Sequence, residues 1–132
     1  MVFVDTSFLY AATDHRDTRH REAVAVLGGL DDMELVTTTH VLGESWTLTR
    51  RRLGHHEATR LVDGIRQSKR YTVAHAPPNL ENAAFDWLLR HDERAYSFVD
   101  AVSFATMRER RIDRAMAFDG DFEAAGFQTV KP

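Results

Sequence analysis

The sequence predicts an α/β fold in which a short parallel sheet lies between two layers of helices. Short apolar segments alternate with amphipathic ones in the order β-α-β-α-α-β-α-α-β-α-β. An acidic residue, Asp5, directly follows the first apolar segment, where open parallel sheets place functional side chains. Because the 132 residues contain no linker, repeat or low-complexity stretch, we expect one domain, residues 1–132.

Five short segments have the composition of strands in a parallel sheet. The first reads Val-Phe-Val and ends at Asp5. The fourth is followed by Asp119. If these two strands are neighbours, the two carboxylates share one crevice at the edge of the sheet. The strands are expected at residues 2–4, 34–38, 71–73, 114–118 and 127–130.

The helices are indicated by apolar periodicity and by capping residues. Thr38 or Thr39 can cap the central helix, and Gly54 ends it. Asn79 is expected to cap the helix after the two prolines, and Ser97 and Asp100 have the spacing of a capping box. A helix could also begin within residues 8–12. The helices are expected at residues 17–27, 40–53, 56–68, 80–90 and 97–111, with a short helical turn at 120–125.

The composition restricts the classes of function. The chain has no cysteine, which excludes disulfides and cysteine zinc sites, and its seven histidines do not form the pair of a helical zinc site. No apolar run approaches a membrane span and no basic-then-apolar leader precedes the first strand, so we expect a cytoplasmic protein without a membrane partner. The net charge is −3, and removing five clustered acids from it leaves +2, which would suit a nucleic-acid partner.

Four acids besides Asp5 could meet it at the edge of the sheet. Asp119 and Asp121 flank a glycine after the fourth strand, while Glu44 and Asp100 are expected on the inward, apolar faces of their helices. Several buried carboxylates repel one another and lose hydration, and a hard divalent cation offsets both costs. Mg²⁺ or Mn²⁺ held by carboxylates can activate water for attack on a phosphodiester.

In this order and context, the acids resemble those of PIN-domain ribonucleases, and most closely of VapC-type toxins from toxin–antitoxin pairs. The resemblance rests on Val-Asp-Thr-Ser at 4–7, Glu44, Ser-Phe-Val-Asp-Ala at 97–101 and Ala-Phe-Asp-Gly-Asp-Phe at 117–122. It implies a three-layer α/β/α PIN-like domain and a metal-dependent endoribonuclease that cleaves tRNA, an rRNA loop or mRNA. It further implies a VapB-like antitoxin and a homodimer. The implied catalytic and metal-binding acids are Asp5, Glu44, Asp100 and Asp119, with Asp121 as an accessory metal ligand and Thr6 or Ser7 as accessory hydrogen-bond donors.

Each acid also has a purely structural interpretation. Asp5 can cap the following helix, Asp100 can serve only its capping box, Glu44 can pair with an arginine, and Asp119 can belong to an ordinary turn. The alternative function is therefore a non-catalytic PIN-like interaction module. A receiver-like phospho-acceptor domain is disfavoured, because no lysine is expected beside Asp5.

Basic residues form three clusters that could contact RNA phosphates. Phosphate contacts supply affinity and salt dependence but carry no sequence information. The same arginines could instead complement the carboxyl ends of helices. The helices around residues 40–68 are apolar enough to offer a groove to a partner helix, although they could simply pack on each other. The clusters are Arg16, Arg19 and Arg21; Arg50, Arg51 and Arg52; and Arg108, Arg110, Arg111 and Arg114.

Overall fold

The central sheet has five strands in the order β3-β2-β1-β4-β5 in the computed structural model, which describes residues 1–131. Every neighbouring pair is parallel. The first and fourth strands are adjacent, with Phe3 opposite Ala115 and Val4 opposite Met116. The predicted parallel sheet is therefore confirmed. The strands are β1 (Val2–Val4), β2 (Leu35–Thr38), β3 (Tyr71–Ala74), β4 (Arg114–Met116) and β5 (Gln128–Thr129).

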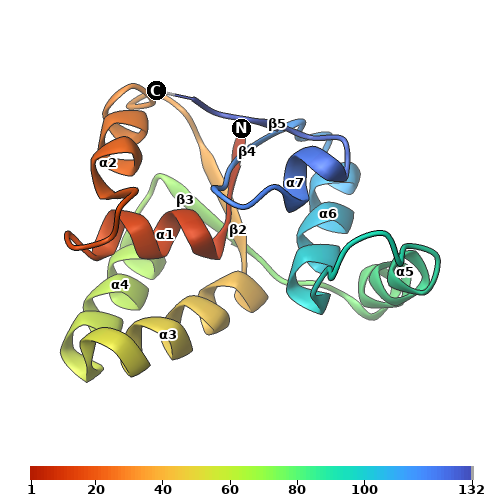
Figure 1. Ribbon diagram of the computed structural model, residues 1–132, viewed down its shortest axis with the longest axis horizontal. Coiled ribbons are helices and arrows are strands. Elements are labelled where there is room, and N and C mark those ends of the chain that lie inside the picture. Colours follow the sequence, from red (N-terminus) through yellow and green to blue (C-terminus); the bar gives the residue numbers. More distant parts are fainter. Residues whose placement is uncertain (132) are drawn as a thin grey trace.

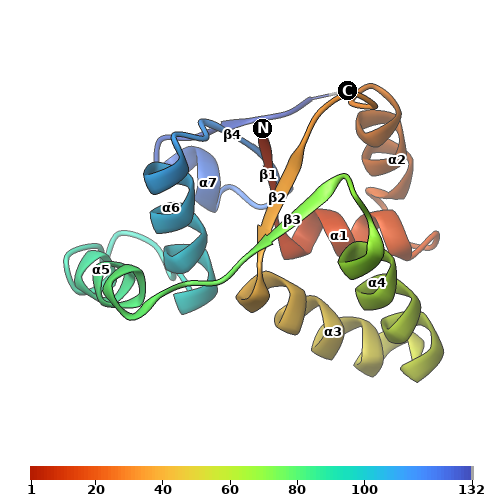
Figure 2. The ribbon, with the colours of Figure 1, turned by 180° about the vertical axis from the view of Figure 1, so that it is seen from behind.

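Within residues 1–131, seven helices cover the two faces of the sheet, which confirms the three-layer α/β/α arrangement. The first four helices lie on one side of the strands and the last three on the other (Figures 1 and 2). This division follows from right-handed crossovers that reverse direction after β3. Within residues 1–131 no helix combines the length and apolarity of a membrane span. The helices are α1 (Thr6–Thr13), α2 (His20–Gly28), α3 (Thr39–Leu53), α4 (His55–Gln67), α5 (Pro78–Leu89), α6 (Phe98–Arg110) and α7 (Asp121–Ala124).

The core surrounds β1, the middle strand, whose three residues are completely buried. Covered on both faces, such a strand has an unbroken apolar sequence rather than an alternating one. On the side of α6, Phe104 packs edge-to-face on Phe122 with ring centroids 5.0 Å apart, and Phe122 in turn meets Phe3 at 6.0 Å. The first strand and its terminal acid are thus held by rigid packing from the C-terminal half of the chain.

Several predicted boundaries differ from the structure. Residues 6–13 form a separate helix, α1, which Asp5 caps. The next helix, α2, begins at His20 instead of at residue 17. Asn79 is not a cap, since Pro78 occupies the first turn of α5 and Pro77 precedes it, a position that suits a residue without an N–H. The fourth strand ends at Met116 instead of residue 118, and the chain leaves the sheet earlier than its apolar sequence suggested.

Candidate active site

Asp5 lies at the carboxyl edge of the sheet, where β1 and β4 end side by side. Its backbone N–H donates to the carbonyl of Met116 at 3.0 Å, so the end of one strand is tied to the end of the other. The side chain is 3% exposed and caps α1, accepting from the Ser7 N–H at 3.2 Å. Asp5 therefore does cap the following helix, which was the structural alternative considered for it in the sequence. This capping role fixes the Asp5 carboxylate at the sheet edge, where a site would need it.

Ser7 connects the two strand ends through its hydroxyl. The hydroxyl donates to Asp5 Oδ2 at 2.8 Å and accepts from the Phe118 N–H at 3.0 Å. Ser7 thus performs the hydrogen bonding that was predicted for Thr6 or Ser7. The Thr6 hydroxyl is buried and has no hydrogen-bond partner among residues 1–131.

Replacing Ser7 with alanine should remove both of these hydrogen bonds and leave the Phe118 N–H without a partner. We expect the free energy of unfolding to fall by about 1–3 kcal/mol, since a buried donor loses its acceptor. Chemical denaturation of Ser7→Ala beside the parent protein measures this change. Thr6→Ser, which keeps a hydroxyl at the neighbouring position, is the matched control and should change stability less. Equal losses in the two variants would contradict the bridging role of Ser7.

Asp5 and Asp119 are electrostatically coupled. Burial, followed by the negative charge of Asp119, raises the pKa of Asp5 to about 7. Burial also raises the pKa of Asp119, while the Asp121 N–H, at 3.2 Å from Asp119 Oδ1, and a hydrogen bond with Asp5 oppose the rise. The two carboxyl groups therefore behave as a pair, and the pKa of Asp5 lies near neutrality.

Asp100 joins this pair from the first turn of α6. The predicted capping box is present: the Asp100 N–H donates to Ser97 Oγ and the Ser97 N–H donates to Asp100 Oδ2, both at 3.0 Å. Burial nevertheless raises the pKa of Asp100 to about 6, and the charges of Asp119 and Asp121 contribute to the rise. Asp100 therefore serves the cap and also belongs to the acidic group.

Asp121 lies at the outer side of the group and pairs with a cation that the sequence analysis missed. Arg94 Nε donates to Asp121 Oδ1 at 2.9 Å. The guanidinium lies against Gly120, where an added Cβ would meet it at 3.3 Å, so glycine leaves room for this contact. No sequence pattern links Arg94 with Asp121, because the pairing depends on how the loop before α6 folds over the turn after β4.

Glu44 is not on the inward face of α3, and that prediction was wrong. The buried positions of this helix are Val41, Leu42, Ser45 and Thr49, and Glu44 is exposed. The helix packs on both α1 and α4, and the side that carries Glu44 is left uncovered. The structure therefore brings the aspartates near enough for their charges to raise one another's pKa values, whereas Glu44 is on an exposed face of α3.

Glu44 lies one helical turn after the residue through which α3 contacts α6. His40, one turn earlier on α3, contacts the ring of Phe98 edge-on with centroids 5.6 Å apart. Phe98 lies two residues before Asp100 at the start of α6. The first turns of α3 and α6 therefore meet beside the sheet edge.

The donor chemistry of the aspartate group fits a hard divalent cation. Burial, together with the charges of neighbouring aspartates, raises the pKa values of Asp5, Asp100 and Asp119, so a cation beside them would stabilise their charged forms. Oxygen donors of this kind favour Mg²⁺ or Mn²⁺. Among residues 1–131, however, no three acids or histidines stand close enough to surround one ion, so side chains must turn for binding. The aspartates thus have the chemistry of cation ligands, but their side chains are not arranged as a complete coordination site.

These features define a class: a parallel α/β/α domain with aspartates gathered at the carboxyl edge of its sheet, an arrangement suited to hydrolysis of phosphodiesters. Residues 2–128 match the PIN domain family. The chain is 50% identical over 132 residues to the 23S rRNA-specific endonuclease VapC20 of Mycobacterium tuberculosis, and the alignment covers 100% of this chain and 99% of that protein. The chain belongs to the PIN-domain family and, within it, to the VapC-type toxins, which are ribonucleases.

Solved structures agree with this assignment. The crystal structure of M. tuberculosis VapC20, described as a sarcin–ricin loop cleaving toxin, matches with a TM-score of 0.94 over 100% of both chains. FitAcB from Neisseria gonorrhoeae matches with a TM-score of 0.67 at 15% identity, covering 100% of this chain and 98% of that one. At that identity the second likeness supports the fold alone.

Proposed function

We propose that this protein is an endoribonuclease toxin that hydrolyses one phosphodiester in the sarcin–ricin loop of 23S rRNA. The observation that carries the proposal is the 50% identity to VapC20 along the whole chain, with a TM-score of 0.94. Choice of RNA depends on surface shape and loops as well as on the catalytic acids. Similarity that extends over the full length therefore supports a shared target, in addition to shared chemistry.

Asp5, Asp100 and Asp119 are the proposed catalytic acids, and we assign Glu44 and Asp121 to the same site as outer ligands. A bound Mg²⁺ or Mn²⁺ would supply positive charge at the scissile phosphate and lower the pKa of the attacking water. The protein itself contributes the positions of the donors. The Ser7 hydroxyl holds Asp5, the Ser97 cap holds Asp100, and Arg94 holds Asp121.

The proposed partners are a VapB-like antitoxin and a second copy of the chain, acting in the cytoplasm where ribosomes lie. An apolar pocket of about 220 Å³ between α3 and α4 supports docking of an antitoxin helix. On α5, Phe85 is 52% and Leu89 86% exposed, which supports self-association through that helix. The pocket is lined by Thr39, Leu42, Gly43, Trp46 and Val62.

The test is cleavage of ribosomes and of an isolated sarcin–ricin loop RNA by antitoxin-free protein, in Mg²⁺, Mn²⁺ or EDTA. We expect one discrete cut in 23S rRNA that needs the metal and disappears in Asp5→Asn. Asparagine is the matched replacement because it also caps helices well and removes only the charge. Mapping the 5′ end of the fragment locates the cut.

The outcomes separate the alternatives. A metal-dependent cut elsewhere in cellular RNA would retain the nuclease and reject the sarcin–ricin loop as its target. Cleavage that persists in Asp5→Asn would show a contaminating nuclease. Intact RNA, together with a melting temperature that Mn²⁺ does not raise, would favour the non-catalytic interaction module.

A further inference from the structure

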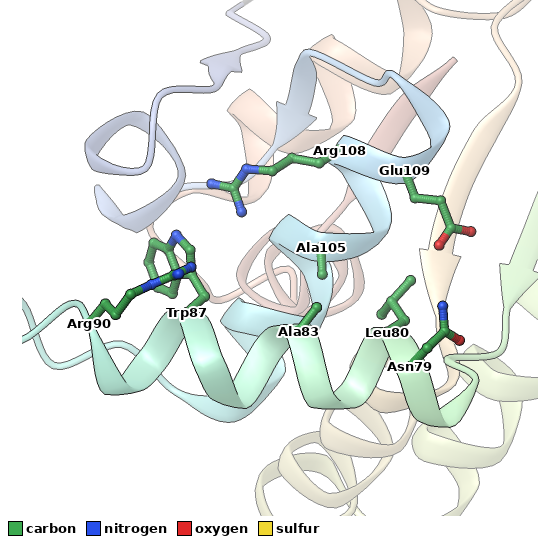
Figure 3. A pocket seen from close by; sticks show the side chains of 8 residues that line it. All are labelled: Asn79, Leu80, Ala83, Trp87, Arg90, Ala105, Arg108 and Glu109. Atoms are coloured by element: carbon green, nitrogen blue, oxygen red, sulfur yellow. The ribbon is translucent and has the colours of Figure 1, made fainter.

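A cavity of about 510 Å³ lies between α5 and α6, outside the aspartate group (Figure 3). Its size falls within the range of small-ligand sites. None of the acids assigned to the active site lines it. The floor is formed by small residues of both helices, so the two helices leave an open groove between their larger side chains. The lining residues are Asn79, Leu80, Ala83, Trp87, Arg90, Ala105, Arg108 and Glu109.

One end of the cavity carries two guanidinium groups. Arg90 and Trp87 both line this end, and the guanidinium of Arg108 projects toward the Trp87 ring (Figure 3). Neither arginine forms an ion pair within residues 1–131. Two cations without a carboxylate partner, aimed at one space, are an arrangement that attracts an anion.

Arg108 is exposed, but two aromatic rings position its guanidinium. Its guanidinium lies over the rings of Trp87, at 5.6 Å from the centroid, and of Phe127, at 5.3 Å. Partial loss of hydration there lowers its pKa. Because the group is already positioned and partly dehydrated, less ordering is needed when an anion arrives.

The other end of the cavity excludes a second anion. Glu109 and Asn79 stand opposite the arginines (Figure 3). The cavity is therefore polarised, and an anion is confined to the end beside Trp87. The indole itself is already stacked on His91, with centroids 4.1 Å apart and an angle of 21° between the rings. Since part of that surface is taken by the chain's own histidine, the cationic end suits a phosphate better than a stacked base.

We propose that Arg90 and Arg108 bind a phosphate of the RNA substrate at a distance from the cleaved bond, an inference that rests on the proposed ribonuclease function. Asp100 and Arg108 lie on the same helix, eight residues apart. At the rise of an α-helix this is roughly 12 Å, which a few nucleotides can span. This separation is short enough for one RNA molecule to contact the catalytic acids and, at the other end of α6, this cavity.

The experiment measures KM and kcat for a sarcin–ricin loop RNA at several salt concentrations, with Arg90→Gln, Arg108→Gln and Glu109→Gln. We expect each arginine variant to raise KM about five- to tenfold with little change in kcat, because the contact is equal in ground and transition states. The slope of log KM against log salt should fall by about 0.7 for one lost phosphate contact. Glu109→Gln should lower KM. Arg110→Gln, an exposed cation of the same helix outside the cavity, is the matched control.

Equal effects of Arg90→Gln and Arg110→Gln would overturn the proposal, since general surface charge would then explain both. If Arg108→Gln loses stability with its ring contacts, Arg90→Gln and Glu109→Gln still decide the question. Binding of AMP that depends on Arg90, with unchanged KM for RNA, would assign the cavity to a free nucleotide and also overturn the proposal. Binding of the loop RNA to Asp5→Asn protein, with and without Arg90→Gln, tests the cavity even if the wild-type chain cuts no RNA. This binding measurement therefore distinguishes a failure of the phosphate-site proposal from a failure of the proposed ribonuclease function.

Discussion

Asp100→Asn is expected to reduce RNA cleavage by roughly 100- to 1,000-fold without unfolding the protein, because in the proposed site the charge it removes would hold a cation at the reacting phosphate. The capping box should survive the change. The asparagine side-chain oxygen can still accept from the Ser97 N–H, and the N–H of residue 100 can still donate to Ser97 Oγ. Single-turnover cleavage and circular dichroism measure the two effects.

Asp100→Ala is the companion variant for this prediction. It removes the charge and also the acceptor for the Ser97 N–H, so activity should fall as far while stability falls by about 1 kcal/mol more. If Asp100→Asn keeps full activity, Asp100 serves only the cap, which is the structural alternative that the sequence allowed. The two replacements therefore separate the roles that this one side chain combines.

The second large effect is a gain in stability when the charge of Asp5, a proposed catalytic residue, is removed. In the folded protein the pKa of Asp5 is raised to about 7, from an ordinary value of 3.8. The folded state therefore binds the proton more tightly than the unfolded state, and stability declines as pH rises between about 4 and 7. Without metal, Asp5→Asn should exceed the parent protein in free energy of unfolding by up to about 4 kcal/mol at pH 8. At pH 4 the two should differ little.

Thermal or denaturant unfolding in EDTA at pH 4, 6 and 8 measures this difference. Mn²⁺ should then restore stability to the parent at pH 8 and leave Asp5→Asn nearly unchanged, because binding to the native state stabilises it. Asp113→Asn, at an exposed acid just before β4, is the control and should follow the parent at every pH. If Asp5→Asn is less stable than the parent at pH 8, the folded protein stabilises the charged Asp5 carboxylate, and the prediction is wrong.

The part of the site that could be predicted from sequence is the part fixed by local rules. Asp5 and Asp119 follow the ends of strands, and parallel neighbours bring such ends together. Asp100 was placed by its capping box, which needs only four consecutive residues. In each case short-range geometry determines where the carboxylate points.

The part that could not be predicted depends on packing between distant segments. The face of α3 that is buried depends on how this helix packs on α1 and α4. The sequence pattern of the helix alone allowed Glu44 to be either buried or exposed. The ion pair of Arg94 with Asp121 joins residues from separate loops. The cavity between α5 and α6 likewise depends on the crossing of two helices, although the sequence had already marked Arg108 as a candidate phosphate contact.

The raised pKa values of the aspartates also bear on how cells could escape the toxin. Replacing a carboxylate with a neutral isostere inactivates the proposed site and at the same time relieves repulsion in the fold. Suppressor alleles that arise under selection would therefore include well-folded proteins and not only truncated ones. Such inactive copies would still occupy antitoxin, so that in a cell carrying both alleles they would leave more of the active toxin free.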